Sequence, residues 1–377
     1  MRLADLPTPC LVLDRTLVRR NVAALEATVG RHGVALRPHL TTAKSIDVAR
    51  LALGGTASPA RGVAVSTLAE AEYFLSHDLT DILYAVGVTP GKLEQVAKLN
   101  AAGGRVTVVT DDPGCASAIA AFPAAPQVLI EVDCGEGRGG VDADGPLLLD
   151  IAARLGIRLA GVMTHGGHSY AGRSTAEMAG VAEAERSAAV RAAERLTAAG
   201  HRIAVVSVGS SPTVLHARGL AGVTEARAGA CLFGDLFQAQ IGTHNEADIA
   251  LSVLASVIGA RPPQGRWPGG ALLLDAGSVA LSMDRSTAAS PSDLGFGLMT
   301  DRDGRASFGR AIVRAVWQEQ ALVELDLAAA PLQPIGVGSK VRVLPNNSCL
   351  TAAAHDRYFV VEGGDEVVAI WSKVSGW

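Results

Sequence analysis

The chain has 377 residues, 49% of them hydrophobic, and a mean hydropathy of +0.27, which is enough apolar material for a large core in two domains. The net charge is -4 and lysine and arginine do not cluster, which excludes the electrostatic footprint of a nucleic-acid or membrane-surface binder. The five cysteines form no CxxC pair, the N-terminus has no signal-peptide pattern, and no apolar run has the roughly 18 residues of a membrane-spanning helix. We therefore expect a cytoplasmic protein with free thiols whose partner is a small molecule.

A repeated pattern of apolar runs and helical segments occupies the first two thirds of the chain. A short strand at 11–14 and a helix at 15–30 come first, and eight β-rich runs follow. The runs lie at 34–40, 62–67, 81–87, 105–110, 127–133, 159–165, 203–209 and 224–232. Because they are apolar throughout and separated by helices, they indicate a parallel sheet covered on both faces. Eight such units predict a (β/α)8 barrel of the TIM type over residues 15–245.

The composition changes after about residue 241, where longer strands separated by loops replace the helical periodicity. The expected strands lie at 249–258, 271–277, 312–325, 340–345 and 357–373, the last broken by a hairpin turn at 362–365. The segments 262–270 and 284–310 are typical of long loops. These features predict a mainly β domain at 246–377, completed by residues 1–14.

Polar residues gather at the carboxyl ends of the predicted barrel strands, where barrels of this type carry their active sites. Small residues after strands seven and eight offer backbone N–H groups and hydroxyls for a phosphate, although they also suit tight turns. The candidates at the strand ends are Arg37, His39, Thr41, Lys44, Arg138, His165, His168, Tyr170, Gly209, Ser210, Ser211, Gly229 and Ala230.

Two groups of these candidates, and one pair in the predicted β domain, have alternative interpretations. His165 and His168 flank two glycines, and hydrogen bonding within a loop is favoured over a metal pair. Arg138 can contact a ligand or form an ion pair with a nearby carboxylate. Asn347 and Cys349, at the end of a β-domain strand, offer an amide and a thiol, which is a weak zinc site because zinc needs several Cys, His or carboxylate ligands.

Together these residues resemble the D-threonine aldolase and D-serine dehydratase family, relatives of alanine racemase with fold type III around pyridoxal phosphate (PLP). The resemblance is carried by the residues at 7–9, 37–39, 65–71, 133–135, 346, 349–352 and 371–377. It implies a lyase that cleaves or dehydrates a β-hydroxy amino acid, and a homodimer in which the partner's β domain completes each site. It also implies that the PLP ring and phosphate are surrounded by Arg138, His165, Tyr170, Gly209, Ser210, Ser211, Gly229 and Ala230.

The chain departs from the family pattern at the residues that carry the chemistry. The family motif after strand one is similar to Arg-Pro-His-x-Lys-Thr, whose lysine forms the Schiff base with PLP, and Thr41 stands at that lysine position. The family's metal-binding histidine corresponds to Asn347, beside the retained Cys349. Gln320 and Cys231 stand where the family often has a histidine and an aromatic residue. A threonine hydroxyl cannot form an imine, and an amide is a poorer zinc ligand than imidazole. These changes favour PLP held without a covalent bond at Thr41 and argue against a divalent metal.

Only five lysines occur, and Lys44 alone lies near the carboxyl end of a barrel strand. It is the only candidate for a replacement amine, although a shift of three residues changes a side chain's direction. We therefore expect a PLP-linked lyase whose catalytic residues are Lys44, Thr41 and His39, or one that works without a lysine. The alternative is a diverged paralogue that binds PLP or an amino acid without lysine-dependent catalysis. A deliberately inactivated variant is a third interpretation, which the additional changes at Gln320 and Cys231 argue against.

Overall fold

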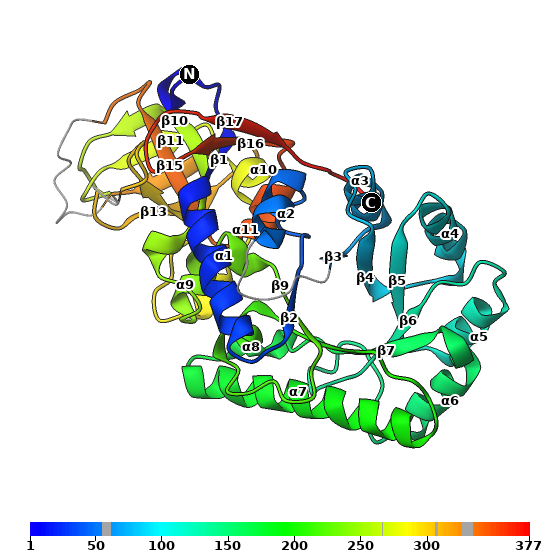
Figure 1. The fold of residues 1–377 in the computed structure, drawn as a ribbon. Coiled ribbons are helices and arrows are strands. Elements are labelled where there is room, and N and C mark those ends of the chain that lie inside the picture. The colour runs from blue at the N-terminus through cyan, green and yellow to red at the C-terminus, as the bar shows by residue number, and fades with distance from the viewer. Residues whose placement is uncertain (55–61, 266, 306–307, 326–334) are drawn as a thin grey trace. The chain divides into compact units, whose positions relative to one another are not determined.

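The computed structural model describes residues 1–54, 62–265, 267–305, 308–325 and 335–377 (Figure 1). The chain divides into two compact units. The barrel unit consists of Val22–Gly229 with Val374–Trp377, and the β unit consists of Met1–Asn21 with Ala230–Lys373. The domain boundary at residue 245 remains a prediction, and these compact units divide nearer to Gly229.

The barrel unit is built on eight parallel strands, as the apolar runs predict. In spatial order they are β2 (Ala35–Pro38), β9 (Glu225–Ala228), β8 (Val205–Val208), β7 (Leu159–Met163), β6 (Val128–Glu131), β5 (Arg105–Thr110), β4 (Asp81–Gly87) and β3 (Val63–Val65). The two ends of the sheet meet where His39 forms a parallel bridge with Ala64, and the Leu40 N–H donates to the Ala64 carbonyl at 2.9 Å. The residues that follow strand β2 therefore close the barrel.

Helices connect the barrel strands and bury their apolar faces. They are α1 (Arg15–Gly30), α2 (Ile46–Leu53), α3 (Leu68–Leu75), α4 (Leu93–Ala101), α5 (Pro113–Ala121), α6 (Pro146–Leu155), α7 (Thr175–Ala198) and α8 (Ser211–His216), with short 3-10 turns at Pro90–Lys92, Gly156–Arg158 and Gly167–Ala171. Helix α7, the long green helix in Figure 1, packs against β7, β8 and α8. No described helix has the length and apolar character needed to cross a membrane.

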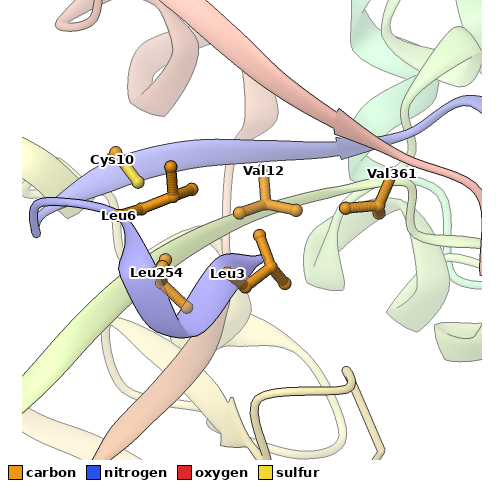
Figure 2. Close-up of a cluster of buried hydrophobic side chains, with 6 residues drawn as sticks. All are labelled: Leu3, Leu6, Cys10, Val12, Leu254 and Val361. Atoms are coloured by element: carbon orange, nitrogen blue, oxygen red, sulfur yellow. The ribbon is translucent and has the colours of Figure 1, made fainter. Parts of the chain in front are cut away.

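The β unit contains a nine-stranded sheet whose pairings are antiparallel except between β1 and β16. The strands are β1 (Cys10–Asp14), β10 (Leu251–Arg261), β11 (Ala271–Leu274), β12 (Gly297–Thr300), β13 (Ala311–Val316), β14 (Ala321–Glu324), β15 (Lys340–Pro345), β16 (Arg357–Val361) and β17 (Ala369–Ser372). Figure 2 shows a buried cluster in which Leu3, Leu6 and Cys10 from the N-terminus pack with Val12, Leu254 and Val361. The N-terminal segment is therefore part of this core.

Short elements complete the β unit. They are the helices α9 (Leu236–Gln240), α10 (Ser278–Leu281) and α11 (Ser348–Ala353), and 3-10 turns at Leu3–Asp5, Ala230–Leu232, Glu246–Asp248 and Ser286–Ala289.

Two sequence predictions for the β unit differ from the structure. The expected strand at 312–325 is a hairpin of β13 and β14, because the chain turns back after Val316 and the Trp317 N–H donates to the Gln320 carbonyl at 2.8 Å. The expected loop at 284–310 contains strand β12, which pairs with β15 and β13. Strand β12 is only four residues long, so its formation depends on these partners rather than on a visible alternation in the sequence.

Candidate active site

The end of strand β2 is fixed by buried charges inside the barrel unit. The Arg37 guanidinium donates from Nε to both carboxylate oxygens of Glu225, at 2.9 and 3.0 Å, and from Nη1 to Asp81 at 2.9 Å. Gly229, at the end of β9, approaches so closely that a Cβ there would lie 2.2 Å from the His39 carbonyl oxygen. Only glycine permits this contact between the two strand ends.

Two histidines at the strand ends, His39 and His165, are neutral near pH 7. Burial, followed by the charges of Arg227, His165 and Lys44, lowers the pKa of His39 to about 3. Burial and the charge of Arg138 lower the pKa of His165 to about 4, against the hydrogen bond of its ring to Gly209. Near neutral pH both rings are therefore imidazole rather than imidazolium, so neither serves as a general acid, and both are weak bases.

The loops after β7 and β8 are tied together by four contacts. His165 Nδ1 donates to the Gly209 carbonyl at 2.7 Å, and because a carbonyl only accepts, the Nε2 atom of the neutral ring is left as an acceptor. The Ser169 and Ser210 hydroxyls lie 2.9 Å apart. Glu185, on helix α7, accepts from Gly166 N at 2.6 Å and from Gly209 N at 2.9 Å.

The expected phosphate cradle is partly occupied by these internal contacts. The Gly209 N–H is bound to Glu185, and the Ser210 N–H donates to the Thr213 hydroxyl at 3.0 Å in a capping box at the start of α8. Ser210 and Ser211 are buried, and Ser210 shares its hydroxyl with Ser169 and Thr213. The small residues thus form tight turns held by internal hydrogen bonds, and the phosphate interpretation stays a prediction.

Thr41 and Lys44 follow β2 in a turn that precedes α2. Thr41 is half-buried, and its side chain has no hydrogen-bond partner among the described residues. Lys44 adopts a left-handed backbone conformation with φ of 49°, and its ammonium forms an ion pair with Glu70, which is fully buried near the start of α3. The amine of Lys44 therefore has a structural partner.

The other four lysines also have partners elsewhere. Lys92 Nζ donates to the Tyr84 hydroxyl at 2.7 Å, and Lys98 pairs with Glu94 on the surface of α4. In the β unit, Lys340 donates to the Leu6 carbonyl, and Lys373 donates to the carbonyls of Ala352 and His355. Each of the five amines is thus engaged by another group of the chain.

The remaining candidates of the barrel unit differ in exposure. Arg138 is 58% exposed and lies 3.6 Å from the Glu136 carboxylate, so the ion-pair interpretation has a contact in the structure. His168 lies in the 3-10 turn after β7, and its Nδ1 is buried without a partner among the described residues, like Nδ1 of His39. Tyr170, in the same turn, is half-buried and accepts from Arg173 through its carbonyl.

Ala230, Asn347 and Cys349 belong to the β unit. Ala230 begins the 3-10 turn Ala230–Leu232. The Asn347 side-chain oxygen caps helix α11 by accepting from Cys349 N at 3.0 Å and Leu350 N at 3.2 Å. No group of three or more His, Cys, Asp or Glu side chains placed to hold a metal ion occurs in the part of the chain that the structure describes. The residues present therefore do not fit a metal ion at Asn347 and Cys349.

Two buried charged residues lie outside the set that the sequence indicates. Arg227 is fully buried at the end of β9 and donates to the Ser207 hydroxyl and the Thr164 carbonyl. Glu185 is 1% exposed. Its signal is visible in the sequence of α7, because a glutamate occupies the stripe of buried positions formed by Met178, Ala182, Ala189, Ala192 and Leu196.

Comparison with known proteins identifies the family. The protein family described as "Alanine racemase, N-terminal domain" matches residues 13–236. The family described as "Putative serine dehydratase domain" matches residues 250–361. D-threo-3-hydroxyaspartate dehydratase of Delftia sp. (strain HT23) is 41% identical over 100% of this chain and 99% of its own length. The chain belongs to the fold type III family of PLP-dependent lyases.

Other members of the lyase family support the fold along the whole chain. D-serine dehydratase of Dictyostelium discoideum is 27% identical over 99% of this chain and 98% of its own length. The solved structure of D-threo-3-hydroxyaspartate dehydratase from Delftia sp. HT23 matches with a TM-score of 0.92 and 39% identity over 100% of both chains. The predicted family and the predicted barrel with a mainly β domain are both confirmed.

The barrel unit offers groups for non-covalent binding of PLP, the family's cofactor. Arg227 provides a buried positive charge, and His165 presents an Nε2 acceptor. The buried Nδ1 atoms of His39 and His168 have no partner in the described residues, and buried polar atoms of this kind are rare unless another group satisfies them. The residues present do not fit a covalent link to PLP, because Thr41 has no amine and Lys44 is paired with Glu70.

Proposed function

We propose that this protein is a lyase of β-hydroxy amino acids that holds PLP without a covalent bond to the chain. The observation that carries the proposal is the ion pair between Lys44 and Glu70, which engages the one amine near strand β2 while Thr41 occupies the family's lysine position. The substrate class is supported by D-threo-3-hydroxyaspartate dehydratase and D-serine dehydratase, which resemble the chain over nearly its full length.

The residues of the barrel unit that we propose to hold the cofactor lie at the carboxyl ends of the strands. They are Arg138, His165, Tyr170, Gly209, Ser210, Ser211 and Gly229, and the assignment of Ala230 stays a prediction from the sequence. When bound, PLP supplies an electron sink for charge that develops at the substrate α carbon.

The chain's own residues set what the site does. Arg227, fully buried, favours a negative charge nearby, and His165 accepts a hydrogen bond at Nε2 because its Nδ1 proton is bound to Gly209. His39 is neutral and a weak base, so it orients a donor more readily than it removes a proton from carbon. The Thr41 hydroxyl can donate or accept a hydrogen bond but cannot replace an amine as a base.

This arrangement predicts slow turnover. General acid–base catalysis by a positioned group contributes roughly 10²–10⁴-fold to a rate. Because no lysine amine is available at Thr41 and the nearby histidines have lowered pKa values, most of that factor is absent. Binding and orientation of the substrate remain.

The test combines cofactor attachment with product formation. The purified protein is incubated with PLP and divided into two halves. One half is reduced with borohydride, digested and analysed by peptide mass spectrometry, and no lysine should carry the cofactor. Gel filtration should remove PLP from the other, untreated half. Cofactor attached to Lys44 would refute the non-covalent proposal. D-threo-3-hydroxyaspartate, D-serine and D-threonine are then assayed for 2-oxo acid, ammonia, glycine and aldehyde, with PLP alone as the control.

A second candidate is a binding protein that has lost lysine-dependent catalysis. It is favoured by the same ion pair and by the helix-capping role of Asn347, because both the amine and the metal ligand of the family are replaced. Calorimetry would then show PLP or its amino-acid adduct binding, while product formation stays at the level of PLP alone. Product above that level for any of the three substrates would exclude this candidate.

We also propose a homodimer formed through the β unit. Val279, Met283, Trp317 and Leu350 are between 51% and 65% exposed, and exposed apolar side chains that lie close together mark interaction surfaces. They lie on connected elements, since Ser278 N donates to the Trp317 carbonyl at 2.7 Å and helix α10 packs against α11. Light scattering should give twice the chain mass of 38.6 kDa, and Trp317→Glu should reduce it to one chain. A monomer before the substitution would refute the proposal.

A further inference from the structure

A single carboxylate on helix α7 binds both loops that carry the candidate cofactor residues. Oε1 of Glu185 accepts from Gly166 N at 2.6 Å and from Gly209 N at 2.9 Å. Gly166 follows strand β7 and Gly209 follows strand β8, so one oxygen joins the ends of two neighbouring strands. Glu185 is 1% exposed, and its contacts are therefore shielded from water.

The two glycines leave no room for another arrangement. A Cβ at Gly166 would lie 2.9 Å from the Thr213 methyl and 3.3 Å from the Glu185 carboxyl carbon. Gly209 has φ of +145°, and a Cβ there would lie 2.0 Å from the Arg227 carbonyl oxygen. The backbone at both sites thus approaches its neighbours as closely as glycine allows, with the N–H groups directed to Glu185.

Two further contacts of the site lie directly beside these N–H bonds. The N–H of Gly209 donates to Glu185, and the carbonyl of the same residue accepts from His165 Nδ1 at 2.7 Å. Ser210, the next residue, shares its hydroxyl with Ser169 and begins α8. His165 and Ser210 are therefore both joined to the residue that Glu185 binds, the first by a hydrogen bond and the second by a peptide bond.

We infer that Glu185 is a positioning residue: through Gly166 and Gly209 it holds the two loops so that His165 keeps its Nδ1-protonated form and Ser210 faces the cofactor phosphate. The part that concerns the cofactor rests on the proposed function. A single oxygen accepts both bonds, so an amide oxygen can replace it in these two contacts, while the carboxylate charge acts separately on the buried Arg227.

Three substitutions and a control separate this role from general stability. Glu185→Ala removes the acceptor, and Glu185→Leu removes it while filling the space. Glu185→Gln retains one accepting oxygen. Glu194→Ala removes an exposed carboxylate from the same helix and is the matched control.

The first measurement uses the protein without added ligand. Amide hydrogen exchange at Gly166 and Gly209 and the nitrogen shifts of the His165 ring are recorded by NMR. Loss of a buried hydrogen bond to a carboxylate is expected to raise exchange at both amides by about tenfold or more in Glu185→Ala and Glu185→Leu, with a mixture of His165 ring tautomers. Glu185→Gln and Glu194→Ala should stay within about threefold of the original protein.

The second measurement is the affinity for PLP and for pyridoxal, which lacks the phosphate. Glu185→Ala and Glu185→Leu should weaken PLP about tenfold or more and pyridoxal less, whereas Glu185→Gln should bind PLP within about threefold of the original protein. Folded Glu185→Leu with unchanged amide exchange and an unchanged His165 tautomer would overturn the inference. Failure of the original protein to bind PLP would instead refute the proposed function, while the exchange and ring data still decide whether Glu185 holds the loops.

Discussion

The Lys44 ammonium forms an ion pair with the carboxylate of Glu70, which is fully buried. The second Glu70 oxygen accepts from Ser66 N at 3.0 Å, so the carboxylate joins the turn after β2 to the start of α3. The Lys44 carbonyl in turn accepts from Val374 N at 2.8 Å. Lys44 therefore holds three segments of the barrel unit together, and its amine is used in doing so.

Lys44→Met should destabilise the protein by about 3 kcal/mol, because it leaves the buried Glu70 charge with only a backbone partner. The free energy of unfolding is measured by urea titration. Lys98→Met is the control, since the pair of Lys98 with Glu94 is exposed and should contribute less than about 0.5 kcal/mol. The double change Lys44→Met with Glu70→Leu should recover much of the loss. Equal effects of Lys44→Met and Lys98→Met would contradict the structural role of the ion pair.

Thr41→Lys should restore a covalent link to PLP. The new amine would stand at the family's lysine position, whereas Lys44 stays paired with Glu70. Borohydride followed by peptide mass spectrometry should find the cofactor at position 41 alone, and activity on the best substrate should rise by about 10²–10⁴-fold, the range of a positioned base. Thr41→Met, similar in length without an amine, should show neither change. Absence of the cofactor from position 41 would show that more than this residue has been lost.

The barrel could be predicted from the sequence because its strands are buried on both faces and therefore apolar throughout, so each run is visible alone. Strand β12 could not, because four residues carry too little pattern and its pairing with β15 is a tertiary contact. The hairpin of β13 and β14 was hidden for a related reason. Its turn begins at Val316 and contains Trp317, with none of the glycine or asparagine signals that mark tight turns.

The candidate site could be predicted only in part from the sequence. The absence of an amine at Thr41 followed from the motif after β2, but the partner of Lys44 depends on how α3 packs, which no local pattern gives. The capping role of Asn347 was readable in principle, since asparagine before a short helical run is a preferred N-cap. Its family position instead suggests a metal ligand. Glu185 could have been found from its place on the buried stripe of α7.

Asn347→Ala should destabilise the protein by about 1 kcal/mol, because the N-cap oxygen of α11 accepts two backbone bonds. Asn347→Asp keeps an acceptor at the same position and should have little effect. Ser45→Ala is a matched control, since Ser45 stands at the N-cap of α2 without a side-chain cap bond. If Asn347→Ala and Ser45→Ala had the same unfolding free energy, the cap would not be significant.

Chelation should leave the thermal midpoint and PLP binding unchanged, because the Asn347 oxygen is engaged by α11 and no cluster of metal ligands occurs in the described residues. Asn347→His would place an imidazole near Cys349 and should increase zinc affinity, since imidazole and thiolate are the ligands zinc prefers. Calorimetric titration with zinc compares the affinity of the original protein with that of Asn347→His. A midpoint that falls on chelation of the original protein would show that a metal is bound there after all.

Stability should fall as the pH drops from about 6.5 to 4, because His165 is buried neutral. Its folded pKa of about 4 lies below the unfolded value of 6.5, so the unfolded chain binds more protons in that window and unfolding becomes more favourable as the pH falls. Between pH 7.5 and pH 5 the loss from His165 alone should be about 2 kcal/mol. His39, with a pKa of about 3, acts in the same direction.

His165→Gln isolates this contribution. Asp235 in the β unit has a pKa raised to about 7 by burial, which gives the opposite slope, so the total change with pH mixes both signs. Glutamine can still donate to the Gly209 carbonyl but does not titrate, and the variant should lose about 2 kcal/mol less than the original protein between pH 7.5 and pH 5. Urea unfolding at the two pH values provides the comparison. Parallel losses in the two proteins would mean that His165 is not held neutral, and the Nε2 atom would then be a donor rather than the acceptor that the hydrogen bond to Gly209 requires.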